Sequence, residues 1–230
     1  MNKAHQFKST VAGGYNNTAG YDYSFVGGGR DNVSSGYGSV VAGGSNNNAL
    51  GITSQAGGWY ANANADGCYV WADFSTSNTI SCNAANRYVV RSLGGVFFFA
   101  AGSTQATYTG VLLPPGGTSW IAASDRNIKE NVVPVEPRDV LERLAAMPIA
   151  TWNLKAQDRS IRHMGPMAQD FRAAFGLGET DLGINTIDAD GVALTAIQGL
   201  NAKLEEKVAS QAAEIAELRR MVEALAAGKR

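Results

Sequence analysis

Ser124 and Lys129 are the residues of this 230-residue chain whose types and spacing come nearest to catalytic chemistry. They belong to the segment SDRNIK, residues 124–129, in which a hydroxyl and an amine are five positions apart. A serine hydroxyl becomes a good nucleophile when a neighbouring base removes its proton, and a desolvated lysine amine can be that base. The spacing alone is common, and a polar loop or a helix N-cap is the alternative interpretation. The surrounding sequence has to decide between the two.

The segments that follow favour the catalytic interpretation. The pattern predicts a helix at residues 137–147 and a strand at residues 149–155. Two motifs come next, HMGPMAQD at residues 163–170 and AIQGL at residues 196–200. Together with Ser-Asp and the lysine five residues after the serine, they resemble the intramolecular chaperone domain of phage endosialidases and other tail spikes. That domain is also a self-cleaving peptidase, and the same module occurs in the myelin regulatory factor.

The resemblance covers about residues 124–205 and includes two departures from the family pattern. Pro166 stands where the family usually has an aromatic residue, and Asp170 stands where glutamate is commoner. Neither position belongs to the Ser/Lys pair, so the departures bear on local packing rather than on chemistry.

The resemblance implies a serine–lysine dyad that uses no cofactor and no metal. Ser124 is the implied nucleophile, Lys129 is its implied general base, and the Ala123–Ser124 bond is the implied cleavage site. Attack on the preceding carbonyl would give an ester by an N-to-O shift, and water would then hydrolyse that ester. The reaction would be a single self-cleavage without an external substrate.

Four further residues are candidates for supporting roles. A lysine base has to be desolvated or placed beside another cation, and Arg126 is the nearest cation in the sequence. Because Asp125 would stabilise a charged amine, we expect its carboxylate to point to a backbone N–H or to another chain. His163 is a candidate oxyanion donor, with a structural role as the alternative. Gln169 belongs to the same family motif.

The first part of the chain contains a 15-residue repeat. It is carried by Ser9, Ser24, Ser39 and Ser54, by Asn17, Asn32, Asn47 and Asn62, by Val11, Val26 and Val41, and by the glycine pairs 13–14, 28–29 and 43–44. Gly and Asn tolerate the positive φ angles of tight turns, so each repeat predicts one coil of a parallel β-solenoid. The pattern resembles the head repeats of trimeric autotransporter adhesins and of phage tail fibres; a flexible linker is the alternative.

Residues 68–123 are expected to form a β-rich fibre tip or connector. Short runs rich in β-branched and aromatic residues predict strands, including one at residues 108–113. The run Val96–Phe99 is apolar on both faces, which predicts burial at a subunit interface. Trp71, Phe74 and Tyr88 are candidates for a sugar-binding platform, with core packing as the commoner use of aromatic residues.

Cys68 and Cys82 are the only cysteines, and two cysteines do not make a metal-ligand set. Adjacent strands would bring them within disulfide distance, but free buried thiols are favoured for a cytoplasmic product.

The C-terminal segment, residues 196–230, carries a heptad seam that begins after a turn expected at residues 188–191. Its positions are Ile197, Asn201, Leu204, Val208, Gln211, Ile215, Leu218, Val222 and Leu225. Alternating steps of four and three predict a coiled coil, and we expect a parallel homotrimer. An amphipathic helix that folds back on its own domain is the alternative.

The composition excludes several classes of function. A net charge of -1 argues against nucleic acid as a partner. No apolar run is long enough for a membrane helix, and the start MNKAHQFKST lacks a signal-peptide core. We therefore expect synthesis in the bacterial cytoplasm. Residues 1–123 hold 20 of the 27 glycines but only 9 charged residues, so the two halves follow different structural principles.

The sequence thus predicts a mainly β N-terminal half followed by an α+β chaperone domain that ends in a long trimeric coiled-coil helix. The expected domains are solenoid repeats at 1–67, a connector at 68–123, the self-cleaving chaperone at 124–195 and the coiled coil at 196–230. The resulting hypothesis is a phage or prophage-type tail fibre or spike whose chaperone assembles the trimer and then releases itself. The mature part would lie on the virion tail, without the released chaperone. The alternative is a non-cleaving adhesin-like module that binds a host glycan or protein.

Overall fold

The computed structural model describes residues 1–102 and 109–227. Tyr108, the first residue of a predicted strand, and the last three residues of the predicted coiled coil lie outside the described residues. The chain divides into two compact units, Met1–Glu130 and Asn131–Arg230, which are described separately below.

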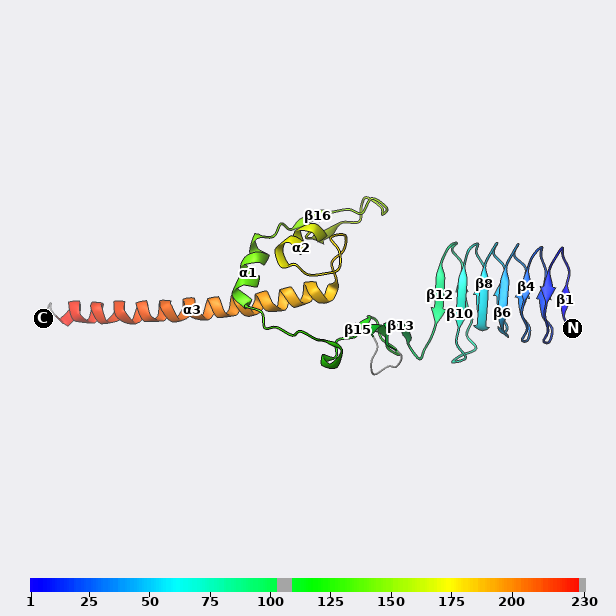
Figure 1. The fold of residues 1–230 in the computed structure, drawn as a ribbon, viewed down its shortest axis with the longest axis horizontal. Coiled ribbons are helices and arrows are strands. Elements are labelled where there is room, and N and C mark those ends of the chain that lie inside the picture. The colour runs from blue at the N-terminus through cyan, green and yellow to red at the C-terminus, as the bar shows by residue number, and fades with distance from the viewer. Residues whose placement is uncertain (103–108, 228–230) are drawn as a thin grey trace. The chain divides into compact units, whose positions relative to one another are not determined.

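The first unit begins with a parallel β-solenoid of about six coils (Figure 1). One sheet contains β1 (Lys3–Ala4), β3 (Thr18–Ala19), β5 (Val33–Ser34), β7 (Asn48–Ala49), β9 (Ala61–Ala63) and β11 (Ile80–Cys82). The other contains β2 (Thr10–Val11), β4 (Phe25–Val26), β6 (Val40–Ser45), β8 (Gln55–Trp59), β10 (Tyr69–Ala72) and β12 (Tyr88–Arg91). The sequence prediction of a solenoid is confirmed.

The repeated residues of each coil fill the interior and satisfy its polar groups. Val26 and Val41 are fully buried. Asn32 is also fully buried, donates to the carbonyls of Gly28 and Gly44, and accepts from the backbone N–H of Asn47. The repeated serines close the preceding turn, as when the Ser39 hydroxyl donates to the carbonyl of Gly36. This hydrogen bonding explains why serine and asparagine recur inside a core.

The buried asparagine ladder ends one coil earlier than the sequence spacing indicates. The coil after Asn47 is one residue shorter, because Gln55 pairs with Tyr69. Asn62 consequently pairs with Asn48, and Ala61 occupies the inward position after Asn47. Asn62 therefore does not belong to the buried ladder.

The glycine pairs allow successive coils to approach closely. Gly44 has a φ of +96°, and a Cβ at this position would lie 1.9 Å from the carbonyl oxygen of Gly58. A Cβ at Gly29 would likewise lie 2.0 Å from the carbonyl oxygen of Gly44. Any side chain here would push the coils apart, so the ladder of glycines is a steric requirement.

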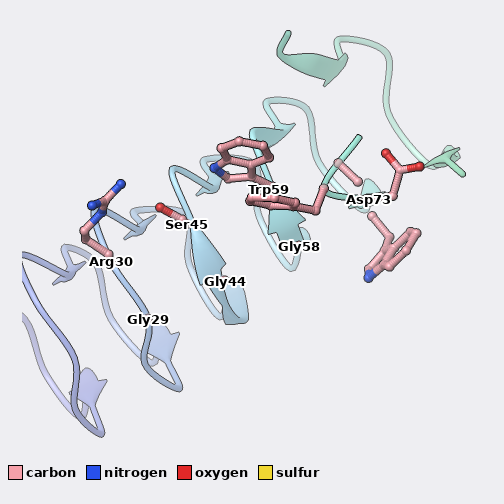
Figure 2. A pocket seen from close by; sticks show the side chains of 10 residues that line it. Gly29, Arg30, Gly44, Ser45, Gly58, Trp59 and Asp73 are labelled. Atoms are coloured by element: carbon pink, nitrogen blue, oxygen red, sulfur yellow. The ribbon is translucent and has the colours of Figure 1, made fainter. Parts of the chain in front are cut away.

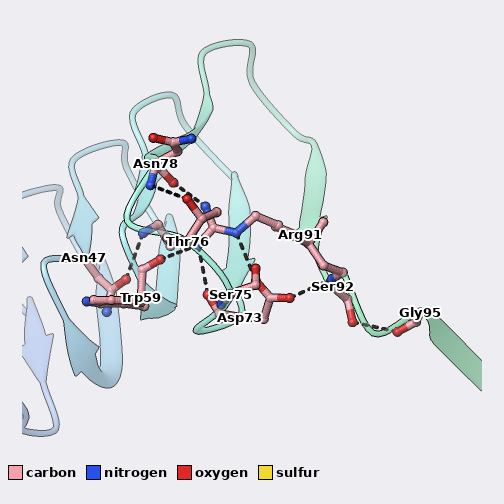
Figure 3. A network of polar contacts seen from close by, with 11 residues as sticks. Asn47, Trp59, Asp73, Ser75, Thr76, Asn78, Arg91, Ser92 and Gly95 are labelled. Carbon is pink, nitrogen blue, oxygen red and sulfur yellow. Dashed lines mark hydrogen bonds and ion pairs between the residues drawn. The ribbon is translucent and has the colours of Figure 1, made fainter. Parts of the chain in front are cut away.

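The solenoid extends to Arg91, beyond the boundary predicted at residue 67, because β10, β11 and β12 continue both sheets. The Arg91 guanidinium ends the stack by donating to the backbone carbonyls of Trp59, Asp73 and Thr76 (Figure 3). Its Nε also lies 3.1 Å from a carboxylate oxygen of Asp73. The 15-residue period is lost here because the last coil carries an insertion, so the sequence repeat stops before the fold does.

Cys68 and Cys82 form a disulfide with their Cα atoms 6.2 Å apart, which corrects the expectation of free thiols. Both side chains point into the solenoid core, where they are almost fully buried. The coil spacing of about 4.8 Å brings inward residues of adjacent coils within disulfide distance.

A three-stranded antiparallel sheet follows, formed by β13 (Val96–Ala101), β14 (Thr109–Leu113) and β15 (Ile121–Ala122). Within the single chain, Phe98 and Phe99 are 56% and 50% exposed. Val96 and Phe97 are half-buried, so the described residues provide only part of the burial predicted for this run.

The second unit packs two short helices against the start of a long one. Its elements are α1 (Pro137–Ala146), β16 (Ala150–Trp152), β17 (His163–Gly165), α2 (Ala168–Phe175) and α3 (Thr186–Ala227). The core consists of Val140, Met147, Phe171, Val192 and Ala196.

Helix α3 begins before the predicted start of the coiled-coil segment and includes residues 188–191, so the turn expected there is wrong. The Asn185 side chain accepts from the backbone N–H of Ile187 and begins the helix earlier. Within the described residues, none of the helices combines the length and apolar character that a membrane span requires.

Candidate functional site

Ser124 and Lys129 meet in the structure, with the lysine Nζ 2.7 Å from the serine Oγ. Strand β15 delivers the serine, and the N–H of Ala123 donates to the carbonyl of Gly110 at 3.2 Å. A short 3-10 turn, η1 (Arg126–Ile128), then reverses the chain so that Lys129 returns to the serine. The contact is what a serine–lysine dyad needs, and it lies at the predicted scissile bond.

Asp125 caps the turn rather than pairing with Lys129. Its carboxylate accepts from the backbone N–H of Asn127 at 2.8 Å and from the side-chain amide of the same residue at 3.0 Å. This is the backbone contact expected for Asp125. Because the Asp125 carboxylate is engaged by Asn127, it does not compete with the Ser124 hydroxyl for the Lys129 amine.

The dyad is exposed in the single chain, since Ser124 and Lys129 both lie on the surface. A lysine amine acts as a base when it is removed from water or placed beside another cation. Arg126 lies in the turn and is also exposed. The first unit therefore aligns the two groups at its surface.

His163 and Gln169 belong to the second unit, whereas Ser124 belongs to the first. The His163 ring stacks on Trp152 at a centroid distance of 4.8 Å, and its Nε2 lies 2.7 Å from the side-chain oxygen of Gln157. Gln169 is an exposed residue in the first turn of α2. These contacts favour the structural role that was the alternative for His163.

The aromatic candidates separate into two places on the solenoid. Trp71 and Phe74 line one groove together with Trp59. Tyr88 instead stacks on Tyr69, at a ring distance of 4.8 Å. None of the three candidates is in the core, because Trp71, Phe74 and Tyr88 are 39%, 78% and 69% exposed.

The sequence did not single out Arg30, Ser45 and Trp59, which also line this groove. Each follows a glycine pair directly, and this position of the repeat changes from coil to coil. Variation within an otherwise regular repeat was the signal that would have identified them.

The predicted coiled-coil positions from Ile197 to Leu225 are all exposed on helix α3. The face of α3 that packs on its own unit is a different one, formed by Val192, Ala196 and Gly199. The apolar seam is therefore unoccupied by other described residues of the chain. The alternative of an amphipathic helix folded back on its own domain holds for the face of Gly199 and Glu206, which contacts α1, but not for the apolar seam.

Within the described residues, no cluster of His, Cys, Asp or Glu suitable for a metal ion is present. Searches of curated proteins and of solved structures give no significant match to the chain. Residues 124–177 match the family model Peptidase_S74, described as the chaperone of endosialidase. The match begins at Ser124 and includes Lys129, so the segment that starts at these two contacting residues is similar to the endosialidase chaperone domain.

Proposed function

We propose that this chain is part of a phage or prophage-type tail fibre or spike, and that its C-terminal region assembles three chains and then cleaves itself off at Ala123–Ser124. The observation that carries the proposal is the 2.7 Å contact between Ser124 and Lys129 at the first residue of the matched domain. The mature fibre would belong to the virion tail, and the released chaperone would not.

The chemistry needs only residues of this chain. The Ser124 hydroxyl attacks the carbonyl carbon of Ala123 while its proton passes to the Lys129 amine. The bond to the Ser124 nitrogen then breaks, the nitrogen takes up the proton, and an ester joins Ala123 to the serine oxygen. Water hydrolyses the ester, which leaves a carboxylate on Ala123 and a free amine and hydroxyl on Ser124.

We expect assembly to remove the Ser124–Lys129 pair from water. The exposed seam of α3 fits a parallel trimeric coiled coil, which would bring three dyads and three β regions to high local concentration. Solenoid and interlocked strand contacts are largely non-local and therefore slow to form. Cleavage after folding would remove the assembly aid and leave the fibre kinetically stable.

Expression of the full chain beside its Ser124→Ala variant tests the proposal. We expect two fragments on a denaturing gel for the wild type, and one intact chain for the variant. Ser119→Ala is a matched control, because it removes an exposed serine five residues upstream and should cleave normally. Cleavage of the Ser124→Ala chain would show that another nucleophile is responsible.

A mixing experiment tests whether the dyad belongs to one chain. Co-expression of Ser124→Ala with Lys129→Ala places both functional groups in mixed trimers but never in the same chain. Because the two groups meet within one chain, we expect no cleavage. Efficient cleavage of the mixture would show that the active pair forms between chains.

A second role, attachment, is favoured by a separate observation. The groove lined by Trp59 and Trp71 lies on the solenoid surface and is unrelated to the dyad. We propose that the fibre region also binds a host-surface partner, a function that is compatible with self-cleavage and does not depend on it.

A further inference from the structure

A groove crosses the solenoid at the corner where successive coils leave their glycine pairs (Figure 2). Its volume of about 750 Å³ is within the size range of small-molecule sites. Its walls include Arg30, Trp59, Trp71 and Phe74, and glycine backbone such as that of Gly44 lies at its base. Three aromatic side chains therefore converge on one surface groove.

The groove arises from one small side chain in a ladder of large ones. Tyr15, Arg30, Ser45 and Trp59 occupy equivalent positions on consecutive coils. Only Ser45 is too short to cover its neighbours, so a slot opens between the guanidinium and the indole. Phe74, from the next coil, stacks on the indole of Trp59 at 3.9 Å with a 19° angle and thereby fixes the ring.

The slot has room for one flat ring. Arg30 and Trp59 are two coils apart, which places their backbones about 10 Å from each other at about 4.8 Å per coil. A ring in contact with both side chains needs about 4 Å on each side. Ser45 Oγ lies at the base of the slot, where it accepts from the side-chain amide of Asn46 at 2.9 Å.

The charges around the groove compensate each other. Arg30 lies 3.3 Å from the carboxylate of Asp31. Asp73, at the far end, is engaged by Arg91, by Ser75 and by the backbone N–H of Leu93. An aromatic surface with hydroxyl and guanidinium groups but without a net charge suits a neutral sugar, whose C–H face packs on a ring while its hydroxyls form hydrogen bonds.

We propose that this groove binds a neutral oligosaccharide, with one pyranose ring between Arg30 and Trp59 above Ser45 and the next ring on Trp71. The inference rests on the attachment role proposed above and names its site and ligand class. It does not rest on self-cleavage.

The test is a printed array of neutral and acidic glycans, followed by calorimetric titration of the full chain with the neutral glycan retained most strongly. Ser45→Tyr fills the slot with a residue that the repeat already accepts at Tyr15, so the fold should be kept. We expect this variant and Trp71→Ala each to weaken binding by about tenfold or more, which corresponds to about 1.4 kcal/mol. Tyr37→Ala, an exposed aromatic outside the groove, should bind as the wild type does.

Three results would overturn the proposal: retention of acidic glycans alone, retention of no glycan, or neutral binding that Ser45→Tyr leaves unchanged. A Ser45→Tyr chain that no longer forms trimers would instead assign the groove to a second copy of the chain. Repeating the titration with Ser124→Ala separates the two claims, because a groove that binds in the uncleaved chain stands whether or not cleavage occurs.

Discussion

The solenoid buries its apolar side chains within one chain, whereas helix α3 leaves a row of them exposed. In the solenoid, Val26 and Val41 are fully buried by the coils of their own chain. In α3, Ile215 and Val222 point away from every described neighbour and are exposed. The solenoid is completed by repetition along one chain. The seam of α3 and the Ser124–Lys129 pair are exposed, and the proposed function completes both through other chains.

The largest expected effect comes from breaking the seam of α3. Val208→Asp with Ile215→Asp places two carboxylates where each apolar side chain would contribute about 1.5–3 kcal/mol on burial. We expect the trimer to be lost in analytical ultracentrifugation, and self-cleavage to be lost with it. Ala213→Asp, on the outer face of the helix, should leave both unchanged. A trimer that survives the double substitution would place the interface elsewhere.

A smaller effect is expected inside the solenoid, where the repeat supplies its own partners. Asn32→Ala removes two donated hydrogen bonds and the acceptor for Asn47, all in a buried ladder. We expect the free energy of unfolding to fall by about 2–4 kcal/mol in chemical denaturation. Asn48→Ala, at a half-buried position on the next coil with one donated side-chain hydrogen bond, should cost less than about 1 kcal/mol. Equal losses of unfolding free energy in the two variants would show that the buried asparagine ladder contributes no more stability than the half-buried position.

Glycines in α3 distinguish the packed part of the helix from its free surface. A Cβ at Gly199 would lie 2.3 Å from the Pro137 carbonyl oxygen, so Gly199→Ala should destabilise the second unit by about 1–3 kcal/mol. Gly191→Ala meets nothing within 4 Å and should stabilise the same helix by about 0.5–1 kcal/mol. Urea denaturation measures both. Similar effects at the two positions would contradict the close approach of α1 to α3.

The smallest expected effect is a pH dependence at the end of the solenoid. Donation from Ser75, together with the Leu93 N–H and Arg91, lowers the pKa of Asp73 from 3.8 to about 2. Because the folded pKa is the lower one, this stabilisation is present above about pH 4 and is lost as the pH falls toward 2. The melting temperature of the wild type should therefore fall between about pH 4 and pH 2 by more than that of Asp73→Asn. An identical pH profile in the variant would contradict the assignment.

The sequence predicted what depends on local pattern. The serine, valine and glycine spacing gave the solenoid, and the heptad steps gave the long helix. The last two coils were missed because a deletion before Tyr69 and an insertion before Tyr88 shift the period. The disulfide was considered, but free thiols were favoured because a reducing cytoplasm was expected, and redox environment does not follow from strand spacing.

The candidate sites were also predictable only where a local motif marks them. The Ser124–Lys129 pair follows from a motif and is close in space. The groove does not follow from a motif, because it depends on which side chain is absent from a ladder across three coils. The helical course of residues 188–191 was missed because Asp and Gly are turn formers locally, while Asn185 caps a helix that packs on α1.

Cleavage of the Ala123–Ser124 bond is the central proposal, and the intact mass of the wild-type protein after folding reports on that bond. We expect the mass of residues 124–230 with a free N-terminal serine, together with the complementary mass of residues 1–123. A single species at the full 24.1 kDa, in a sample that forms trimers, would contradict it.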